Sequence, residues 1–435
     1  MKNIRLVALL VLLLTVVGMS GVVHAQTEVT LTAWTHDNLY IQYFEQRLPD
    51  FQALHPEVKI NFEPTVDSAA PTNALNAIAA NPGSPELPDM LGIERGAFAN
   101  FTRNGIIAQY FLDLTDTIAD DIDNYSPGRL AIYSYEGKVY GLESQLAASL
   151  LYYQPEVFEK AGVEVPKTWE EVLNVTGPKL AAAGSAFTFA TNDGTWFQMY
   201  FNQRGGEIFD KDGNFVMGDE TNRPLAIEVA TLIQSAINNG SFSVVLGGDV
   251  WGGATLPTAY TTGTLAGTVM PDWWSTCCLQ PYGGPDMAGK WRVALPPVWE
   301  GGGHSTLTWG GTGWSVASGS PNAELAKEFL AFAYTGLESQ VLKFEAINNF
   351  PWYIPAFADP RVSGLEDPYF GGQHLGEFYG QVAEDVPAWY QSPFLPSALT
   401  AMGDNLPALF DGSLTPEAFV DKVVQTTQDA IDFGF

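Results

Sequence analysis

The sequence predicts an α/β protein with parallel β-sheets, because strand-like and helix-like segments alternate along the chain. Residues 28–34 have the composition of a strand, and residues 41–54 place apolar side chains at steps of three and four, as an amphipathic helix does. Residues 58–62 then alternate apolar and polar side chains, which is typical of a second strand. A strand, a helix and a strand in this order form a βαβ unit, whose two strands are parallel.

The later segments continue this alternation. A strand is expected at 88–93 with a helical stretch extending to Gly105, and an apolar strand is expected at 150–153. Thr168 and Glu171 form a capping box, which marks the start of another helix. Further helices are expected toward the C-terminus, and no fixed-period repeat or long linker indicates a flexible tether between modules.

Composition limits the class of partner. The chain has 435 residues, with 20 Lys and Arg against 49 Asp and Glu and a formal net charge of −29. Its 46% hydrophobic and 16% charged residues allow large cores, which excludes a wholly disordered chain. The shortage of cations argues against nucleic acid or anionic lipid as the main partner, because each phosphate contact needs a positive charge. A neutral or cationic ligand is therefore expected.

Residues 1–25 are predicted to be a signal peptide that is removed. Basic residues precede an apolar run at 6–17, and residues 23–25 offer small side chains where a signal peptidase cuts, before Gln26. No later apolar run approaches the ~20 residues that span a bilayer, so we expect a soluble protein in the periplasm or outside the cell. The alternative is that this segment stays in place as an N-terminal anchor helix.

The two cysteines of the chain are adjacent, at Cys277 and Cys278. In an oxidising compartment they form either a vicinal disulfide or two buried thiols, and the sequence leaves both open. Neither alternative predicts a zinc site, since histidines are few and no CxxC motif is present. Residues 210–214 begin like a calcium loop, but Phe215 stands where a glycine is required, so we predict a hairpin turn. We expect neither a metal nor an organic cofactor.

Several blocks of sequence occur in the order found in one known family. They run from about Leu31 to Phe357 and are LTAW, HPEVKI, PDML, NGII, GKVYGL, LLYYQPEVFEKAG, PKTWEEV, FNQRGGEIFDKDG, LAGTVMPDWWS, KWRVALPP and GGTGWSVASGSPNAELAKEFLAF. With these blocks the chain resembles the extracellular solute-binding proteins of ABC importers, of the maltose-binding, carbohydrate-specific kind (family 1). Three features depart from that resemblance. No lipobox cysteine is present, and neither the adjacent cysteine pair nor the long aromatic tail after Pro360 is general in the family.

The resemblance implies two α/β lobes joined by a hinge that the chain crosses three times, near Glu143, near Met270 and around 348–352. Such lobes close over a ligand that contacts both of them. By the matching blocks, the N-terminal lobe comprises residues 26–143 plus 271–347, and the C-terminal lobe comprises residues 144–270 plus 348–435.

A sugar site needs flat aromatic rings against the C–H faces of the sugar and carboxylates or amides for its hydroxyls. Ligands of open α/β sheets bind beyond the carboxyl ends of the strands, and the resemblance places such side chains there. The match is closest at the PDWW turn, where two adjacent rings cannot both face one core. The candidate ligand-binding residues are Trp34, His36, Asp37, Glu94, Arg95, Glu143, Asn192, Asp193, Trp196, Asp272, Trp273, Trp274, Trp309, Gly311, Trp352 and Trp389.

Some of these residues also have a purely structural interpretation. Asp37 and Glu94 stand where helix N-caps are expected, and Arg95 can pair with nearby carboxylates. Any tryptophan can lie in a core instead of a binding site, and we expect Trp169 and Trp291 to do so.

The resemblance, together with 12 tryptophans, predicts a monomeric receptor that binds a carbohydrate and delivers it unchanged to the membrane subunits of an ABC importer. One alternative keeps the receptor but gives it a polyamine or another cation, which the acidity of the chain permits. Another is an exported glycoside hydrolase that uses paired carboxylates. HExxH, GxSxG and P-loop motifs are absent, and we expect no catalytic residues.

Overall fold

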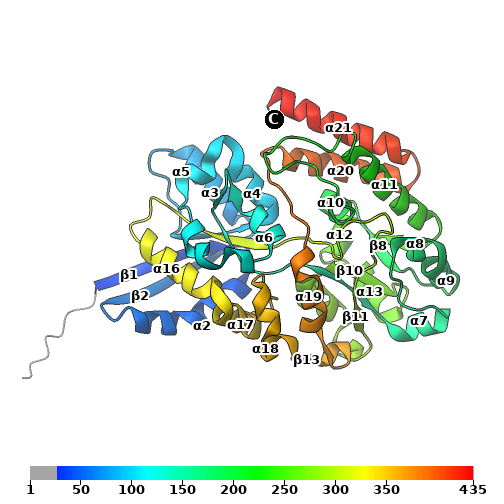
Figure 1. The fold of residues 1–435 in the computed structure, drawn as a ribbon, viewed down its shortest axis with the longest axis horizontal. Coiled ribbons are helices and arrows are strands. Elements are labelled where there is room, and N and C mark those ends of the chain that lie inside the picture. Colours follow the sequence, from blue (N-terminus) through cyan, green and yellow to red (C-terminus); the bar gives the residue numbers. More distant parts are fainter. Residues whose placement is uncertain (1–26, 435) are drawn as a thin grey trace, which may run out of the picture.

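Two β-sheets, each with its own helices, form the two α/β lobes that the sequence predicts (Figure 1). The computed structural model describes residues 27–434, so the predicted signal peptide and its cleavage site before Gln26 lie outside the described residues. Among the described residues, every helix is too short or too polar to span a bilayer.

The first lobe is built on a five-stranded sheet with the strand order β2-β1-β3-β12-β6. Strands β1 and β2 are parallel and β1 is also parallel to β3, whereas β12 runs antiparallel to both of its neighbours. The predicted βαβ unit is therefore confirmed. The five strands are β1 (Thr27–Thr35), β2 (Val58–Val66), β3 (Met90–Glu94), β6 (Leu142–Glu143) and β12 (Thr312–Val316).

Helix α2 (Asn38–Leu54) forms the crossover from β1 to β2 and buries its apolar stripe, which includes Tyr40, Phe44 and Phe51. The stripe recurs every three to four residues, so one face of the helix packs on the sheet while the other stays in solvent. The other helices of this lobe are α3 (Ala70–Ala80), α4 (Arg95–Thr102), α5 (Ile106–Tyr110), α6 (Pro127–Ile132), α16 (Ala323–Tyr334) and α17 (Gly336–Ile347).

The second lobe contains a three-stranded antiparallel sheet, β10-β7-β11, and a parallel pair, β8-β9. A bridge between Ala186 and Leu265 joins the segment before β8 to the segment before β10. The strands are β7 (Ser149–Tyr153), β8 (Thr188–Ala190), β9 (Phe242–Val244), β10 (Gly267–Pro271) and β11 (Arg292–Ala294).

Helices surround these strands, and two sequence predictions hold among them. The Thr168 hydroxyl accepts the Glu171 N–H at 3.1 Å, as a capping box requires, and Trp169 and Trp291 are buried in the core. The larger helices are α7 (Pro155–Ala161), α9 (Gly177–Ala182), α10 (Gly194–Gln203), α11 (Asn222–Asn238), α13 (Thr255–Thr262), α20 (Leu395–Phe410) and α21 (Pro416–Phe433).

The chain passes between the lobes where strands of the two sheets follow one another. Residues 144–148 join β6 to β7, and residues 295–311 join β11 to β12. Strand β11 pairs with the sheet of the second lobe, although it lies within 271–347, the range we assigned to the N-terminal lobe. Figure 1 shows a further segment between the lobes, which leads from α19 (Leu375–Val382) to α20. The lobe boundaries and the three hinge crossings stay a prediction.

Candidate ligand-binding site

A cavity of about 540 Å³ lies where residues of the two lobes meet. Its walls follow the carboxyl ends of β1, β3, β8 and β10, the position at which ligands of open α/β sheets bind. The lining residues are His36, Asp37, Leu39, Tyr40, Glu94, Arg95, Gly96, Gln145, Asp193, Thr195, Trp251, Trp273, Thr276, Cys277, Cys278, Trp309, Gly310, Gly311, Thr312 and Asn349.

Three carboxylates in the cavity wall are also helix N-caps. Asp37, Glu94 and Asp193 cap α2, α4 and α10, and each accepts the backbone N–H two residues later, at 2.9, 2.6 and 2.8 Å. The cap interpretation and the cavity interpretation therefore both hold for Asp37 and Glu94. A capping carboxylate keeps a second oxygen that can accept a hydroxyl proton, and the cap fixes its direction.

Arg95 contributes a buried cation to the same wall. Its side chain is 1% exposed, and its guanidinium carbon lies 3.7 Å from the centre of a Trp389 ring. The Nε and Nη1 atoms have no hydrogen-bond partner among the described residues, and no ion pair to a carboxylate forms there. Burial lowers the pKa of Arg95 to about 10, so it is charged at neutral pH. Arg95 therefore lines the cavity with a charged side chain whose Nε and Nη1 donors are buried and unpaired.

Three indole rings form the aromatic part of the cavity. The rings of Trp251 and Trp273 stack with their centres 6.1 Å apart, and Trp309 meets both edge-on at 5.8 and 6.0 Å. The Trp273 indole N–H donates to the Trp309 carbonyl at 2.7 Å, which fixes the angle of its ring. Trp251 is 49% exposed, and sequence reasoning missed it. The only feature of the sequence that could have indicated a binding position at Trp251 is the glycines on both sides of it, after β9.

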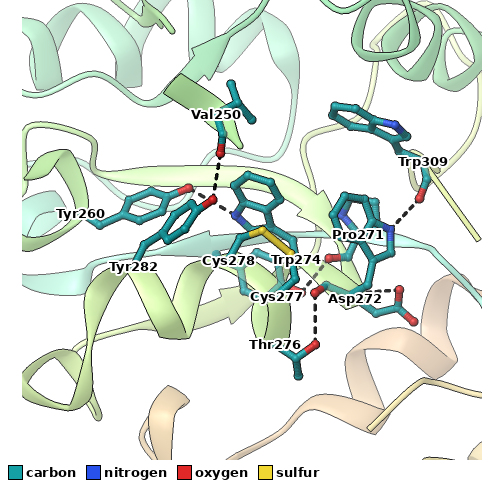
Figure 2. Close-up of a disulfide and its surroundings, with 12 residues drawn as sticks. Val250, Tyr260, Pro271, Asp272, Trp274, Thr276, Cys277, Cys278, Tyr282 and Trp309 are labelled. Carbon is teal, nitrogen blue, oxygen red and sulfur yellow. Dashed lines mark hydrogen bonds between the residues drawn. A yellow bond between two sulfur atoms is a disulfide. The ribbon is translucent and has the colours of Figure 1, made fainter. Parts of the chain in front are cut away.

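The adjacent cysteines are joined by a disulfide, the first of the two alternatives left open by the sequence (Figure 2). They lie in the helical turn η5 (Ser275–Leu279), which begins directly after Trp274. Both cysteines line the cavity.

The profile of the bacterial extracellular solute-binding proteins matches residues 35–335 of the chain. The chain belongs to this family. It is 26% identical to an arabinooligosaccharide-binding protein of Halalkalibacterium halodurans, over 92% of the chain and 88% of that protein. It is 30% identical to an arabinooligosaccharide-binding protein of Bacillus subtilis, over 70% of the chain and 69% of that protein. Its fold is similar to that of the sugar-binding protein MalE of Xanthomonas citri, with a TM-score of 0.75, 17% identity, and coverage of 93% and 98%.

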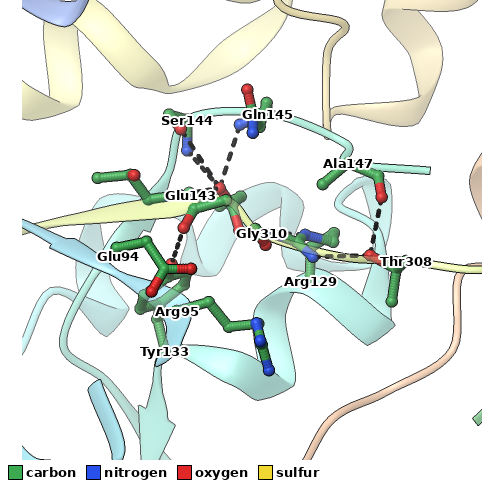
Figure 3. A network of polar contacts seen from close by, with 12 residues as sticks. Glu94, Arg95, Arg129, Tyr133, Glu143, Ser144, Gln145, Ala147, Thr308 and Gly310 are labelled. Atoms are coloured by element: carbon green, nitrogen blue, oxygen red, sulfur yellow. Dashed lines mark hydrogen bonds and ion pairs between the residues drawn. The ribbon is translucent and has the colours of Figure 1, made fainter. Parts of the chain in front are cut away.

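A buried ion pair contacts the cavity wall of this solute-binding protein (Figure 3). Arg129 donates to Oε2 of Glu143 from Nη2 at 2.5 Å and from Nε at 3.1 Å, while Oε1 accepts the Ser144 N–H at 2.9 Å. Burial raises the pKa of Glu143. Arg129 also donates to the carbonyl of Gly310 at 2.8 Å, which anchors the glycine pair in the cavity wall. Glu143, predicted as a ligand contact, is thus fully buried with both oxygens occupied.

The predicted residues fall into two groups in this solute-binding protein. Of the PDWW turn, Trp273 lines the cavity, whereas Trp274, also predicted as a ligand contact, is buried and donates to Tyr260 at 3.3 Å. Asn192 borders a neighbouring cavity of about 420 Å³, which shares Asp193 with the first. The predicted residues that the structure places in the first cavity are His36, Asp37, Glu94, Arg95, Asp193, Trp273, Trp309 and Gly311. Those that it places elsewhere are Trp34, Glu143, Asn192, Trp196, Asp272, Trp274, Trp352 and Trp389.

Packing explains most of the residues found elsewhere. Trp196 lies on α10, whose every residue is buried, and its ring packs on Tyr200 at 4.9 Å. Trp352 packs on Tyr125 at 4.4 Å, and Trp389 lies under Arg95. Trp34 is half-buried on β1 and Asp272 is buried at the end of β10. Among residues 27–434, no three metal-ligating side chains gather into a metal site.

Proposed function

We propose that this protein binds an uncharged oligosaccharide in the cavity between its lobes and delivers it unchanged to the membrane subunits of an ABC importer. The observation that carries the proposal is the composition of the cavity wall. Stacked indole rings suit the C–H faces of sugar rings, and the capping carboxylates with Arg95 suit their hydroxyls. Relatives named arabinooligosaccharide-binding proteins, from two organisms, support a carbohydrate as the cargo.

Two features of the wall disfavour the other candidates. A polyamine would suit the carboxylates and the rings, but it would meet the unpaired cation of Arg95 in the same wall. A glycoside hydrolase needs a carboxylic acid that is protonated near neutral pH at the scissile bond. Burial raises the pKa of Asp272 to about 7, but Asp272 does not line the cavity.

The proposal includes the location and state of the mature protein. Membership of the extracellular family supports export, and the proposal adds cleavage before Gln26 and a monomeric state. N-terminal sequencing of the exported protein tests the cleavage site, and light scattering tests the monomer.

Calorimetric titration tests the cargo. Arabino-, galacto- and malto-oligosaccharides and spermidine are titrated separately, and each sugar is then recovered and analysed for cleavage. We expect saturable heat from at least one oligosaccharide, no heat from spermidine, and no products. Heat from spermidine alone would establish the cation receptor, and shortened sugars would establish the hydrolase.

A further inference from the structure

The cavity wall contains a group that the proposed function has not used, the disulfide between Cys277 and Cys278. This disulfide lies on the same short stretch of chain as Trp273. Thr276 stands between Trp273 and Cys277 in the sequence, and its hydroxyl donates to the Trp273 carbonyl at 3.1 Å. The two sulfurs are unequally exposed, because Cys278 is 4% exposed whereas Cys277 is exposed. Cys278 therefore anchors the disulfide in the core, and Cys277 is the half of the disulfide that is exposed.

The chemistry of the disulfide differs from that of the opposite wall. A disulfide carries no N–H or O–H donor, and sulfur is a weak acceptor, so it cannot satisfy a sugar hydroxyl. The first lobe supplies Asp37, Glu94 and Arg95, all of which hydrogen-bond strongly. The cavity is thus polar on the side of β1 and β3 and largely apolar on the side of β10, where the Thr276 hydroxyl lies between Trp273 and the cysteines and donates to the Trp273 carbonyl. A ligand held between these sides presents hydroxyls to the first and a C–H face to the second.

We propose that the Cys277–Cys278 disulfide is a ligand-contacting element that determines specificity. It forms a flat apolar surface beside Trp273 and selects a sugar ring without a protruding hydroxyl or hydroxymethyl group at that face. The inference rests on the proposed sugar-binding function. It assigns the two cysteines to recognition and not to the stability of the lobe, because a bridge between neighbouring residues closes no loop of useful length.

Reduction changes this surface in a defined way. Side chains of adjacent residues in a helical turn point in different directions, and the bond holds the two sulfurs together against that divergence. Once the bond is reduced, the Cys278 thiol remains in the core and the exposed Cys277 side chain rotates freely. The ligand then meets a mobile thiol in place of a fixed surface and must immobilise it on binding.

The experiment compares oxidised protein, protein reduced with tris(2-carboxyethyl)phosphine, and the Cys277→Ser/Cys278→Ser variant. The phosphine takes an oxygen atom from one water molecule and becomes phosphine oxide, while the disulfide takes up two electrons and the two protons of that water. It has one target, because the chain has two cysteines and both are in this bond. Mass spectrometry of alkylated protein verifies reduction, and thermal unfolding verifies the fold. Kd is measured for two oligosaccharides that differ by one hydroxymethyl group per ring.

We expect reduction and substitution each to weaken binding of the preferred sugar about tenfold, as the loss of one apolar contact in a pocket does. The ratio between the Kd values of the two sugars should become smaller. The phosphine should leave the variant unchanged. Unaltered Kd values on verified reduction would overturn the inference, and so would an equal loss for both sugars, which would indicate a merely structural bond. If the oxidised protein binds no sugar at all, the proposed function itself has failed.

Discussion

The guanidinium of Arg95 stacks on the indole of Trp389, 3.7 Å from the centre of a ring, and so links the start of α4 in one lobe to the segment that leads into α20 in the other. The side chain of Gln391 adds a hydrogen bond to the Arg95 carbonyl at 3.4 Å. Arg95 thus stacks on Trp389, lines the cavity, and keeps two buried N–H donors without a hydrogen-bond partner among the described residues. Its burial costs solvation free energy that the nearby charges of Glu94 and Asp193 offset only in part.

Replacing Arg95→Met should separate binding from stability. Met has a similar length without charge, so the free energy of unfolding should stay the same or rise. Sugar affinity should fall at least about tenfold, because hydrogen bonds from a charged donor are worth about 1.5–3 kcal/mol. Urea unfolding and calorimetry measure the two effects.

The matched control for this variant is Arg103→Met on the same side of the molecule. Arg103 lies 5.9 Å from the Phe394 ring and does not line the cavity, so its loss should leave sugar affinity unchanged. If both variants lost affinity equally, the affinity would depend on positive charge at the contact between the lobes and not on hydrogen bonds from Arg95 to the ligand.

Trp273 and Trp274 should respond oppositely to truncation. Trp273→Ala removes a half-buried ring of the cavity wall, so we expect a loss of about 2 kcal/mol or more in sugar binding with little loss of stability. Trp274→Ala leaves a core cavity and should cost about 3–5 kcal/mol of unfolding free energy. Calorimetry and urea unfolding of both variants check this contrast, and it fails if Trp274→Ala is the one that binds poorly while remaining stable.

The sequence predicts well those features that depend on local pattern. Helix α2 and strand β2 follow from periodicity, and Asp37, Glu94 and Asp193 follow from their position just after strands. Such positions are at once helix N-caps and ligand positions, because parallel strands deliver their ends to one edge of the sheet.

Tertiary packing decides which of the other predicted residues line the cavity, and the local sequence pattern carries no information about that packing. The rings of Trp196, Trp352 and Trp389 look like those of Trp273 in sequence, but each meets a partner from a distant segment or a fully buried helix face. Trp251 follows a strand of three residues, which is too short for periodicity to reveal. Glu143 forms an ion pair with Arg129 and is not free to bind a ligand. This pairing depends on the placement of α6 against β6.

Gly311→Ala should destabilise the protein more than an ordinary glycine substitution. A Cβ there would lie 1.8 Å from Nη2 of Arg129, and the backbone has φ +103°. We expect the loss to approach the about 3–5 kcal/mol that breaking a buried ion pair costs. Gly302→Ala is the control, since its φ is +92° but nothing lies within 4 Å of the added Cβ. It isolates the backbone strain, about 1–2 kcal/mol, and comparable losses in both variants would rule out the clash with Arg129.

Stability should pass through a minimum near neutral pH because of two buried groups, Asp272 and Lys343. Burial raises the pKa of Asp272 from 3.8 to about 7, so between these values the folded state binds more protons than the unfolded state and stability falls as pH rises. Burial lowers the pKa of Lys343 from 10.5 to about 7, so between these values the unfolded state binds more protons and stability rises with pH.

The pH profile of the Asp272→Asn variant checks this assignment. Each group contributes a slope of up to about 1.4 kcal/mol per pH unit, which urea unfolding resolves. The amide removes the acidic limb, so the fall in stability between about pH 4 and 7 should flatten while the alkaline limb, due to Lys343, persists. A variant that keeps the full acidic limb would assign it to another buried carboxyl, of which Glu143 is the first to test because burial raises its pKa too.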